Sequence, residues 1–415
     1  MSSNPQFHGL FPGFSVPMEA LPSILAGSSI LFISIFSITT GNPAWTVFRI
    51  AIAPIAIYFF WDYGYGQHLT EANQVAIGMA FIALYFIMRV METTFDEFLD
   101  HKPPLWVCNG KELPLPKTVA ARALYSFDLL TSLRGNSWFE NTHWNWASKE
   151  VVNPPSSTLS RSRYAKQALI SCVLQYIVID ILDTINRSRT WDLANPHPIT
   201  SLPVSEQIIF SISLCALTAL GITFPYAIMS GLAVALGSPP ANWPPMFDSP
   251  FSATSLANFW GKRWHLIFRR VFSRLTTGIL RILSISPPTS PYKRKFNRAV
   301  LAFVLSACVH IVLMYRLHRE NPQYPNIFFD PSILKFFLSQ PLGLAIEAFL
   351  IIPFSRTLLP EKSRTMVTRV WAWIFMVWSG RFWSDAWVHG GLWGERERGA
   401  GFSVVRGVLH GQWAT

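Results

Sequence analysis

The sequence predicts an all-α, polytopic integral membrane protein with about eight or nine transmembrane helices and a cytosolic amphipathic interfacial helix. Half of the 415 residues are hydrophobic and only 14% are charged, against roughly 25% charged residues in soluble globular proteins. The mean hydropathy is +0.29, and aromatic residues make up 14% of the chain. A soluble fold of this composition would expose large apolar patches to water. We therefore exclude the two or three soluble domains that the length alone suggests.

Eight apolar runs are candidates for membrane spans, each of which needs about 20 residues. They cover Leu21–Thr39, Trp45–Trp61, Asn73–Met91, Gln167–Asp183, Ser205–Gly237, Val300–Tyr315, Ser332–Pro353 and Val367–Trp387. Gly221 and Pro225 interrupt the longest run, so we expect either two tightly connected spans there or one span and a re-entrant piece. No internal repeat of the kind found in many transporters is visible in the sequence.

Polar insertions divide the chain into five segments within a single overall domain. We expect N-terminal spans over 1–92, a polar loop insertion over 93–166, central spans over 167–237, a basic insertion over 238–299 and C-terminal spans over 300–415. The 93–166 insertion is rich in Pro, Trp and Asn and predicts loops and short helices. The N-terminus lacks the basic region and cleavage site of a removed signal peptide, so we expect the first span to be retained.

The net charge of +11 is concentrated in the basic insertion. Residues 238–298 contain ten Lys and Arg side chains and one acidic residue, Asp248, and so carry nine of the eleven net positive charges. By the positive-inside rule this segment faces the cytosol, close to anionic lipid headgroups. Because these basic residues lie beside membrane spans, we favour a lipid surface over a nucleic acid as their partner.

Residues 256–283 place apolar side chains at helical spacing, with Lys and Arg on the remaining arc. The stripe begins with Phe259, Trp260, Trp264 and Phe268. Since the segment has no uncharged run of about 20 residues, it predicts an amphipathic helix that lies in the membrane interface with its aromatic side toward lipid. A simple positional anchor without any chemical role fits this pattern equally well.

His310 is the strongest single candidate for chemistry. It lies inside the run Val300–Tyr315, where an ionisable side chain is costly and therefore suggests a function. Ser306 and Ala307, about one turn earlier, leave room beside the ring. A neutral imidazole accepts a proton, as a general base for a hydroxyl nucleophile must. A structural histidine bonded to a neighbouring helix is equally compatible with this position.

Other polar residues give weaker signals. Gln340 and Glu347 lie within a predicted span and are candidates to line a polar cavity, although Glu347 is equally suited to pairing with a basic group. His389, with Trp383 and Trp387, fits an aromatic belt at the membrane edge.

Two acidic pairs have spacings that suit Mg²⁺ and a prenyl diphosphate. Asp180 and Asp183 end one span, where acidic residues are usually solvated, and Asp96 and Asp100 lack the Asn-rich companion motif. The four cysteines show neither a disulfide framework nor zinc-ligand spacing. We therefore predict no metal site.

The segment Ser255–His265 reads SLANFWGKRWH. It closely resembles the wax-synthase branch of the membrane-bound O-acyltransferase superfamily, whose members carry a version of S-L-x-D-F-W-G-R-R-W-[NH]. That family has a histidine after small residues in a downstream apolar helix, as in LSACVH ending at His310, 45 residues after His265. The RGNSW segment Arg134–Trp138 resembles an R-G-x-x-W element of fungal members. The expected topology also resembles that of the family.

The resemblance implies roles for the site residues. His310 would deprotonate the acceptor hydroxyl for attack on the acyl-CoA thioester, and His265 would orient the acyl-CoA carbonyl or assist the base. The other motif residues expected to bind acyl-CoA, with the two cations facing its phosphates, are Asn258, Trp260, Lys262, Arg263 and Trp264. Asn258 replaces a common Asp and Lys262 replaces an Arg, so the resemblance does not support a mechanism that needs a charged carboxylate at 258.

The resemblance thus implies a multi-pass O-acyltransferase of the endoplasmic reticulum, with acyl-CoA as co-substrate, a hydrophobic alcohol as acceptor and no bound cofactor. Fungal members with the His-ending motif are often acetyltransferases, which implies transfer from acetyl-CoA to a hydroxyl of a terpenoid or meroterpenoid secondary metabolite. The nearest competing hypothesis is a long-chain acyl-CoA:alcohol wax-ester synthase. Two more distant hypotheses are a membrane prenyltransferase or terpene cyclase that uses the acidic pairs and a non-enzymatic transporter with His310 as a polar gate.

Overall fold

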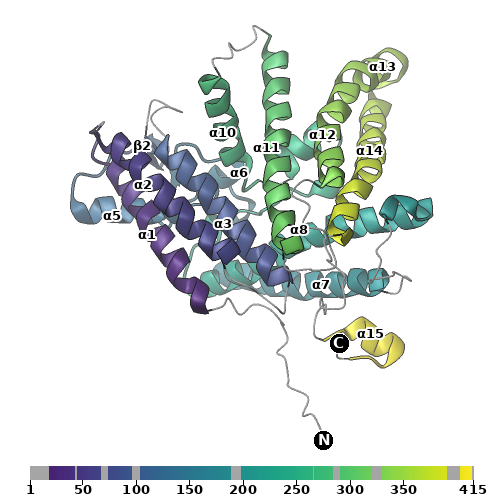
Figure 1. The fold of residues 1–415 in the computed structure, drawn as a ribbon, viewed down its shortest axis with the longest axis horizontal. Helices are drawn as coiled ribbons and strands as arrows, with labels where there is room; N and C mark the ends of the chain where they lie inside the picture. The colour runs from purple at the N-terminus through teal and green to yellow at the C-terminus, as the bar shows by residue number, and fades with distance from the viewer. Residues whose placement is uncertain are drawn as a thin grey trace, which may run out of the picture.

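The computed structural model describes residues 18–42, 44–66, 73–95, 103–187, 198–264, 266–283, 290–319, 330–389 and 402–413. In these ranges the chain is predominantly helical, as predicted (Figure 1). Seven helical segments are long and apolar enough to cross a membrane by length and composition. A polytopic integral membrane protein is thereby confirmed at this level, whereas the number of eight or nine spans stays a prediction.

Every predicted span coincides with a helix. The long helices are α1 (Leu21–Ile38), α2 (Ala44–Trp61), α3 (Asn73–Thr94), α7 (Arg161–Arg187), α8 (Val204–Ala235), α11 (Pro291–Arg319), α12 (Pro331–Ile346) and α14 (Glu361–His389). The π turn η2 (Asp62–Gly66) follows α2, and α12 continues through the π turn η8 (Glu347–Ile351) into α13 (Ile352–Leu358). Helix α14 contains the eighth predicted run but is not among the seven segments that qualify as spans.

The prediction of a break near Gly221 and Pro225 is wrong. Helix α8 is one continuous helix of 32 residues with Pro225 inside it. In a hydrocarbon environment the main chain has no water to bond with, so an unbroken helix is favoured even at the cost of the one hydrogen bond that a proline removes. At 1.5 Å per residue the helix is about 48 Å long, which exceeds the roughly 30 Å hydrocarbon core and implies a tilt.

The remaining elements are short. They are η1 (Met18–Ala20), α5 (Val119–Thr131), α6 (Lys149–Val152), η3 (Pro155–Thr158), η4 (Ile199–Ser201), η5 (Pro240–Asn242), η6 (Pro250–Ser252), α9 (Leu256–Asn258), η7 (Phe259–Arg263), α10 (Arg269–Ile282) and α15 (Val404–His410), with strands β1 (Trp106–Cys108), β2 (Lys111–Glu112) and β3 (Thr142–Trp144).

The predicted loops and short helices of the 93–166 insertion include a small antiparallel sheet that the sequence analysis missed. Its order is β2-β1-β3, with Trp106 opposite Trp144. The β1–β2 turn is Asn109-Gly110, and both residues have positive φ (49° and 77°). Asn-Gly is the commonest two-residue hairpin signal, because these residues adopt such angles readily. The hairpin could therefore have been predicted from this dipeptide.

The RGNSW segment forms a loop held by one buried carboxylate. Asp128 on α5 accepts hydrogen bonds from Trp106 Nε1 (2.6 Å), Ser137 Oγ (2.8 Å) and Trp138 N (2.8 Å). Burial raises the pKa of Asp128, and these three bonds offset part of the effect. Arg134 donates from its guanidinium to the carbonyl of Pro245. The loop thus ties the insertion to the chain that precedes the SLANFWGKRWH segment.

The long helices pack in a spatial order that differs from their order along the chain. Helices α1, α2 and α3 pack in succession, and α3 contacts α11, which continues into the series α12, α14, α8 and α7. Figure 1 shows α1–α3 on one side, α11, α12 and α14 on the other, and α7 running across them. Helix α11, which carries His310, therefore lies between α3 and α12.

The prediction of one amphipathic helix over 256–283 is wrong. The segment is α9, the π turn η7 and, after a bend, α10. Phe259, Trp264, Phe268 and Val271 are buried together against Tyr85 of α3 instead of facing lipid. Large aromatic side chains contribute strongly to the stability of a protein core, which favours their packing against α3. An interfacial location for α10 itself stays a prediction, as do the five segment boundaries.

Two basic residues that were expected at lipid headgroups are inside the protein. Glu92 of α3, which is 2% exposed, forms ion pairs with Arg89 (2.9 Å), Arg270 (2.5 Å) and Arg274 (3.3 Å). Arg270 also lies over the Trp146 ring, 3.9 Å from its centroid. Three guanidinium groups share one carboxylate because a buried charge must be paired. This network joins α3 to α10 and to the 103–160 region, and nothing in the sequence pattern indicated it.

We predict that Gly135→Ala destabilises the protein by roughly 2–5 kcal/mol. Gly135 has φ of +91°, and an added Cβ would lie 2.6 Å from Ala147 Cα, so left-handed strain and overpacking add together. Gly110→Ala is the matched control, because its φ is +77° with nothing within 4 Å of the new Cβ, and we expect it to cost about 1 kcal/mol. Thermal unfolding in detergent measures both; equal losses would contradict the packing argument.

Candidate active site

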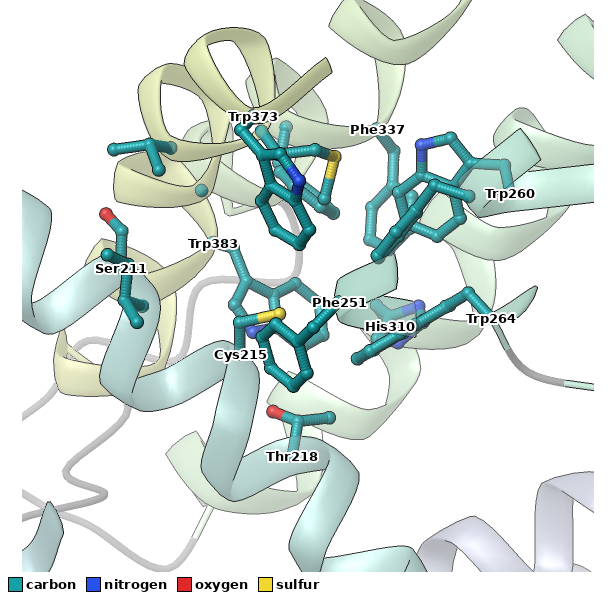
Figure 2. Close-up of a pocket in the computed structure, with 16 residues that line it drawn as sticks. Ser211, Cys215, Thr218, Phe251, Trp260, Trp264, His310, Phe337, Trp373 and Trp383 are labelled. Carbon is teal, nitrogen blue, oxygen red and sulfur yellow. The ribbon is translucent and has the colours of Figure 1, made fainter. Parts of the chain in front are cut away.

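One cavity of about 370 Å³ lies where the SLANFWGKRWH segment meets α8, α11, α12 and α14. Sixteen residues line it: Ser211, Ile212, Cys215, Thr218, Phe251, Phe259, Trp260, Trp264, His310, Phe336, Phe337, Trp373, Met376, Val377, Gly380 and Trp383. Figure 2 shows α8 contributing Cys215 and Thr218 on one side and the aromatic residues enclosing the others. The walls are almost entirely apolar.

His310 lines this cavity with its ring fixed in orientation. Its Nδ1 lies 2.7 Å from the main-chain carbonyl oxygen of Ser306, one turn earlier on α11. Because a carbonyl oxygen only accepts, Nδ1 carries the proton and Nε2 of the neutral ring keeps its lone pair. Phe337 and Trp383 hold the ring, with centroid distances of 4.6 and 4.9 Å. Ser306, one of the two small residues expected to leave room beside the ring, contacts it through its main-chain carbonyl, and the role of His310 as general base stays a prediction.

Three residues of the motif, Phe259, Trp260 and Trp264, line the same cavity as His310. Trp260 packs edge-on against Phe303 of α11 (5.3 Å) and Trp264 stacks on Phe259 (5.1 Å). Phe259 and Trp264 are buried, and Trp260 is half-buried. Residues Phe259–Arg263 form the π turn η7, a wider turn than that of an α-helix. The aromatic side chains of two successive residues in it, Phe259 and Trp260, both line the cavity. The motif therefore forms a wall of the cavity as well as a link between elements.

The polar residues of the motif lie away from the cavity lining. Asn258 Oδ1 accepts a hydrogen bond from Arg263 Nε (2.7 Å) and one from Thr254 N (3.3 Å). Arg263 also donates to the carbonyl oxygens of Asp248 (2.8 Å) and Ser249 (3.1 Å). Both side chains thereby stabilise the turn before α9, whereas Lys262 is exposed to solvent. His265 lies outside the described residues.

The aromatic-belt interpretation is wrong for Trp383 and Trp387, two of the five tryptophans of α14. Trp383 and Trp387 are 8% and 9% exposed and belong to the core around α11 and α12. Trp383 is a neighbour of the His310 ring instead of an interfacial anchor. Helix α14 turns this face toward α12, because its packing partners are α12 and α8. The side chain of His389 lies outside the described residues.

Gln340 and Glu347 do not line the cavity; both contact the motif from behind. Trp260 Nε1 donates to Gln340 Oε1 (3.0 Å). The two carboxylate oxygens of Glu347 accept from Leu256 N (2.5 Å) and Ala257 N (3.0 Å). The expectation that Glu347 pairs with a basic group is therefore wrong, because main-chain amides satisfy it. The sequence identified these two residues as unusual in a span but did not indicate what they hold.

The pair Asp180 and Asp183 holds the C-terminal segment. Asp180 accepts from Ser403 Oγ (2.5 Å) and Val405 N (2.9 Å), and Asp183 pairs with Arg406 (2.8 Å). Both carboxylates are buried, so the expectation of solvated acids at a helix end is wrong. Asp96 and Asp100 lie outside the described residues. Among the residues that are described, no group of three His, Cys, Asp or Glu side chains has a geometry that suits a metal ion.

Fold and site together define a multi-pass helical membrane protein with an apolar cavity lined by the fixed imidazole of His310, an arrangement suited to group transfer between hydrophobic substrates. Residues 243–338, which contain both the motif and His310, match the family model for the membrane bound O-acyl transferase family. Together with the relatives described next, this match supports the wax synthase-like branch of that family. It is an acyl-transferring enzyme; acyltransferases of this family take acyl-CoA as co-substrate and an alcohol as acceptor.

Several fungal proteins are similar to this chain over much of its length. The acetyltransferase ataH of Aspergillus terreus is 27% identical over 286 residues, covering 63% of this chain and 88% of the relative. The acetyltransferase ple2 of Rhodocybe pseudopiperita is 23% identical over 295 residues, or 69% and 74% of the two chains. The O-mevalon transferase macI of Penicillium terrestre is 26% identical over 286 residues, or 65% and 61%.

We predict that Asn258→Asp retains activity and Asn258→Leu does not. Both contacts of this side chain use its Oδ1 atom as an acceptor, and an Asp keeps that acceptor and adds charge opposite Arg263. Leu leaves the Arg263 guanidinium without this partner, which we expect to lower thermal stability and activity together. Activity assays and melting temperatures of the two variants test this. An inactive but fully stable Asn258→Asp would indicate that the amide acts on substrate.

Proposed function

We propose that this protein transfers an acetyl group from acetyl-CoA to a hydroxyl of a terpenoid or meroterpenoid secondary metabolite in the endoplasmic reticulum, with His310 as general base. The observation that carries the proposal is the Nδ1 to Ser306 carbonyl contact of 2.7 Å, because it leaves Nε2 as the basic atom of a ring that lines the cavity. The names of two relatives, both acetyltransferases, support the acetyl donor. The terpenoid acceptor rests on the resemblance to fungal members.

The chemical step needs only the imidazole and two well-placed substrates. Nε2 takes the proton of the acceptor hydroxyl while its oxygen attacks the thioester carbonyl of the acyl-CoA. The tetrahedral intermediate collapses with cleavage of the C–S bond. The leaving CoA thiolate takes the proton back from the imidazolium, so the histidine returns to its neutral state. General base catalysis of this kind contributes typically 10²- to 10⁴-fold in rate.

The cavity walls suit a hydrophobic acceptor. The hydroxyls of Ser211 and Thr218 donate to the carbonyls of Gln207 (2.7 Å) and Leu214 (2.8 Å) on their own helix, so they are already engaged. With their hydrogens taken, these two hydroxyls can only accept further hydrogen bonds, so a sugar or another polyol would regain few of the partners that it loses with its hydration. A volume of about 370 Å³ is in the range of roughly 300–1,000 Å³ for small-molecule pockets. Such walls also limit access of water to the thioester.

We propose that the motif forms the acyl-CoA side of the site. Trp260 and Trp264 line the cavity, and the exposed Lys262 is available to the CoA phosphates, whereas Arg263 supports the turn that presents it. His265 retains the role implied by the resemblance, to orient the acyl carbonyl or assist the base. Under this assignment the cytosolic basic insertion receives the soluble co-substrate, and the acceptor enters from the membrane.

We predict that His310→Ala lowers the transfer rate by about 10²- to 10⁴-fold without loss of the folded protein. The measurement uses microsomes with labelled acetyl-CoA and candidate hydroxylated terpenoids. His410→Ala is the matched control, because His410 is exposed on α15, outside the cavity. Full transferase activity in His310→Ala would show that the proposed base is wrong.

We predict that acetyl-CoA is used in preference to palmitoyl-CoA and that chelating divalent cations has no effect on the rate. The two donors are supplied separately to the same microsomes with terpenoid and long-chain alcohols. Preference for palmitoyl-CoA and a fatty alcohol would support a wax-ester synthase instead. A strict Mg²⁺ requirement would support a prenyltransferase, and the absence of any ester product with every donor would favour a transporter.

A further inference from the structure

Two buried polar side chains of the α12–η8 helix hold the motif in place, and we propose that Gln340 and Glu347 are positioning residues for the acyl-transfer site. Gln340 would fix the indole of Trp260 as a wall of the cavity that contains His310, and Glu347 would fix the main chain at the start of α9. The inference rests on the proposed function, since it assigns a role to the same cavity.

The orientation of the Gln340 amide is determined by its other contacts. The side chain is fully buried, and its Nε2 donates to the carbonyl of Phe336 (3.0 Å) and to Ser379 Oγ (3.2 Å). Ser379 Oγ in turn donates to the carbonyl of Phe375 (2.8 Å). With both amide hydrogens engaged, Oε1 is the atom that faces the Trp260 N–H at 3.0 Å. The amide therefore acts as a fixed acceptor for the indole.

The same helix controls both halves of the site. Phe337, three residues before Gln340, packs against the His310 ring at 4.6 Å. Phe336, four residues before, contacts Trp260 at 6.3 Å between centroids. Residues three and four apart share one face of a helix. One face of α12 therefore sets the position of the imidazole and of the indole relative to each other. Figure 2 shows Phe337 of this face with Trp260 and His310 around the cavity.

The burial of the Glu347 carboxylate is energetically unfavourable at this location. It is 1% exposed, within a helix that is apolar enough to span a membrane, and burying a carboxylate costs several kcal/mol unless hydrogen bonds compensate. Its partners are main-chain N–H groups of Leu256 and Ala257. These bonds fix the backbone at the start of the motif. Because this buried carboxylate bonds to the backbone of the motif, we infer that it fixes the location of the motif.

The α12–η8 helix and the motif both depart from regular α-helix where they contact each other. Glu347 begins the π turn η8, and the motif residues Phe259–Arg263 form the π turn η7. A π turn costs stability relative to an α-helix and occurs often at functional sites. Here each turn lies next to a cross-contact between α12 and the motif, at Glu347 in one case and at Trp260 in the other. This agrees with a contact that serves positioning and not only packing.

The central experiment is a double-mutant cycle on the Gln340–Trp260 pair. Gln340→Leu and Trp260→Phe each remove one side of the hydrogen bond, and we expect each to lower kcat/KM by about 10-fold. The double variant should be no worse than the poorer single variant, because the second change removes nothing further. We also expect the ratio of acyl-CoA hydrolysis to acyl transfer to rise in all three, since a loosened wall admits water.

Gln207→Leu is the matched control. Gln207 is also a buried glutamine in a membrane helix, and its Nε2 donates to the carbonyls of Thr200 (3.2 Å) and Leu202 (2.8 Å), away from the motif. We expect it to lower the melting temperature but to leave the ratio of hydrolysis to transfer unchanged. Additive effects in the cycle, or an unchanged ratio in Gln340→Leu, would overturn the positioning role.

Glu347→Gln tests the second positioning residue independently. The variant keeps the shape of the side chain but presents an NH₂ group, which cannot accept, to one of the two main-chain N–H donors. We expect a larger fall in kcat/KM than in Gln340→Leu, with a raised ratio of hydrolysis to transfer; wild-type kinetics would overturn its role. If this variant does not fold, the Gln340–Trp260 cycle still decides the proposal. The proposed function is tested separately. Full transferase activity in His310→Ala would contradict it, whatever the result of the Gln340–Trp260 cycle.

Discussion

The absence of water inside a membrane is the constraint on which the rest of this structure depends. Polar groups placed there must find partners within the protein, since an unpaired one costs several kcal/mol. Asp385 of α14 illustrates this: it accepts from Ile199 N (2.7 Å) and Ser332 Oγ (2.8 Å) and thereby joins α14 to η4 and to the start of α12. Buried polar residues such as Asp385 form hydrogen bonds between helices that otherwise pack through apolar side chains.

The same constraint explains how the cavity becomes chemically selective. Hydroxyl groups on its wall are engaged by carbonyls of their own helix, as for Thr218, whereas the free lone pair on Nε2 of His310 follows from the bond that its Nδ1 makes to Ser306. A main-chain carbonyl fixes the tautomer without adding a negative charge near the base, unlike the carboxylate of a catalytic triad. A neutral orienting group is the cheaper choice in a medium of low dielectric constant.

Sequence predicted most of the helices and half of the site. Hydropathy located every long helix because length and apolarity are local properties, and the motif with His310 gave the cavity because Trp260 and Trp264 line it. Two of the failures share one cause, which is that the contacts are not local in the sequence. Helical periodicity cannot distinguish a stripe that packs on lipid from one that packs on α3, so it predicted one helix and the wrong environment for residues 256–283. Ion pairs such as Glu92–Arg270, separated by 178 residues, have no local signature.

The two buried glutamates, Glu92 and Glu347, have different kinds of partner, and the difference indicates different roles. Glu92 has three guanidinium partners, so its charge is balanced and its role is to join α3 to α10. Glu347 is held by main-chain amides of the motif and by the Ser255 hydroxyl, which bring partial charges only and leave more of the burial cost uncompensated. A network that served stability alone would be replaceable by apolar packing of similar volume. The carboxylate with the poorer compensation is the one that contacts the segment forming the cavity wall, which is where position matters most for the geometry of acyl transfer.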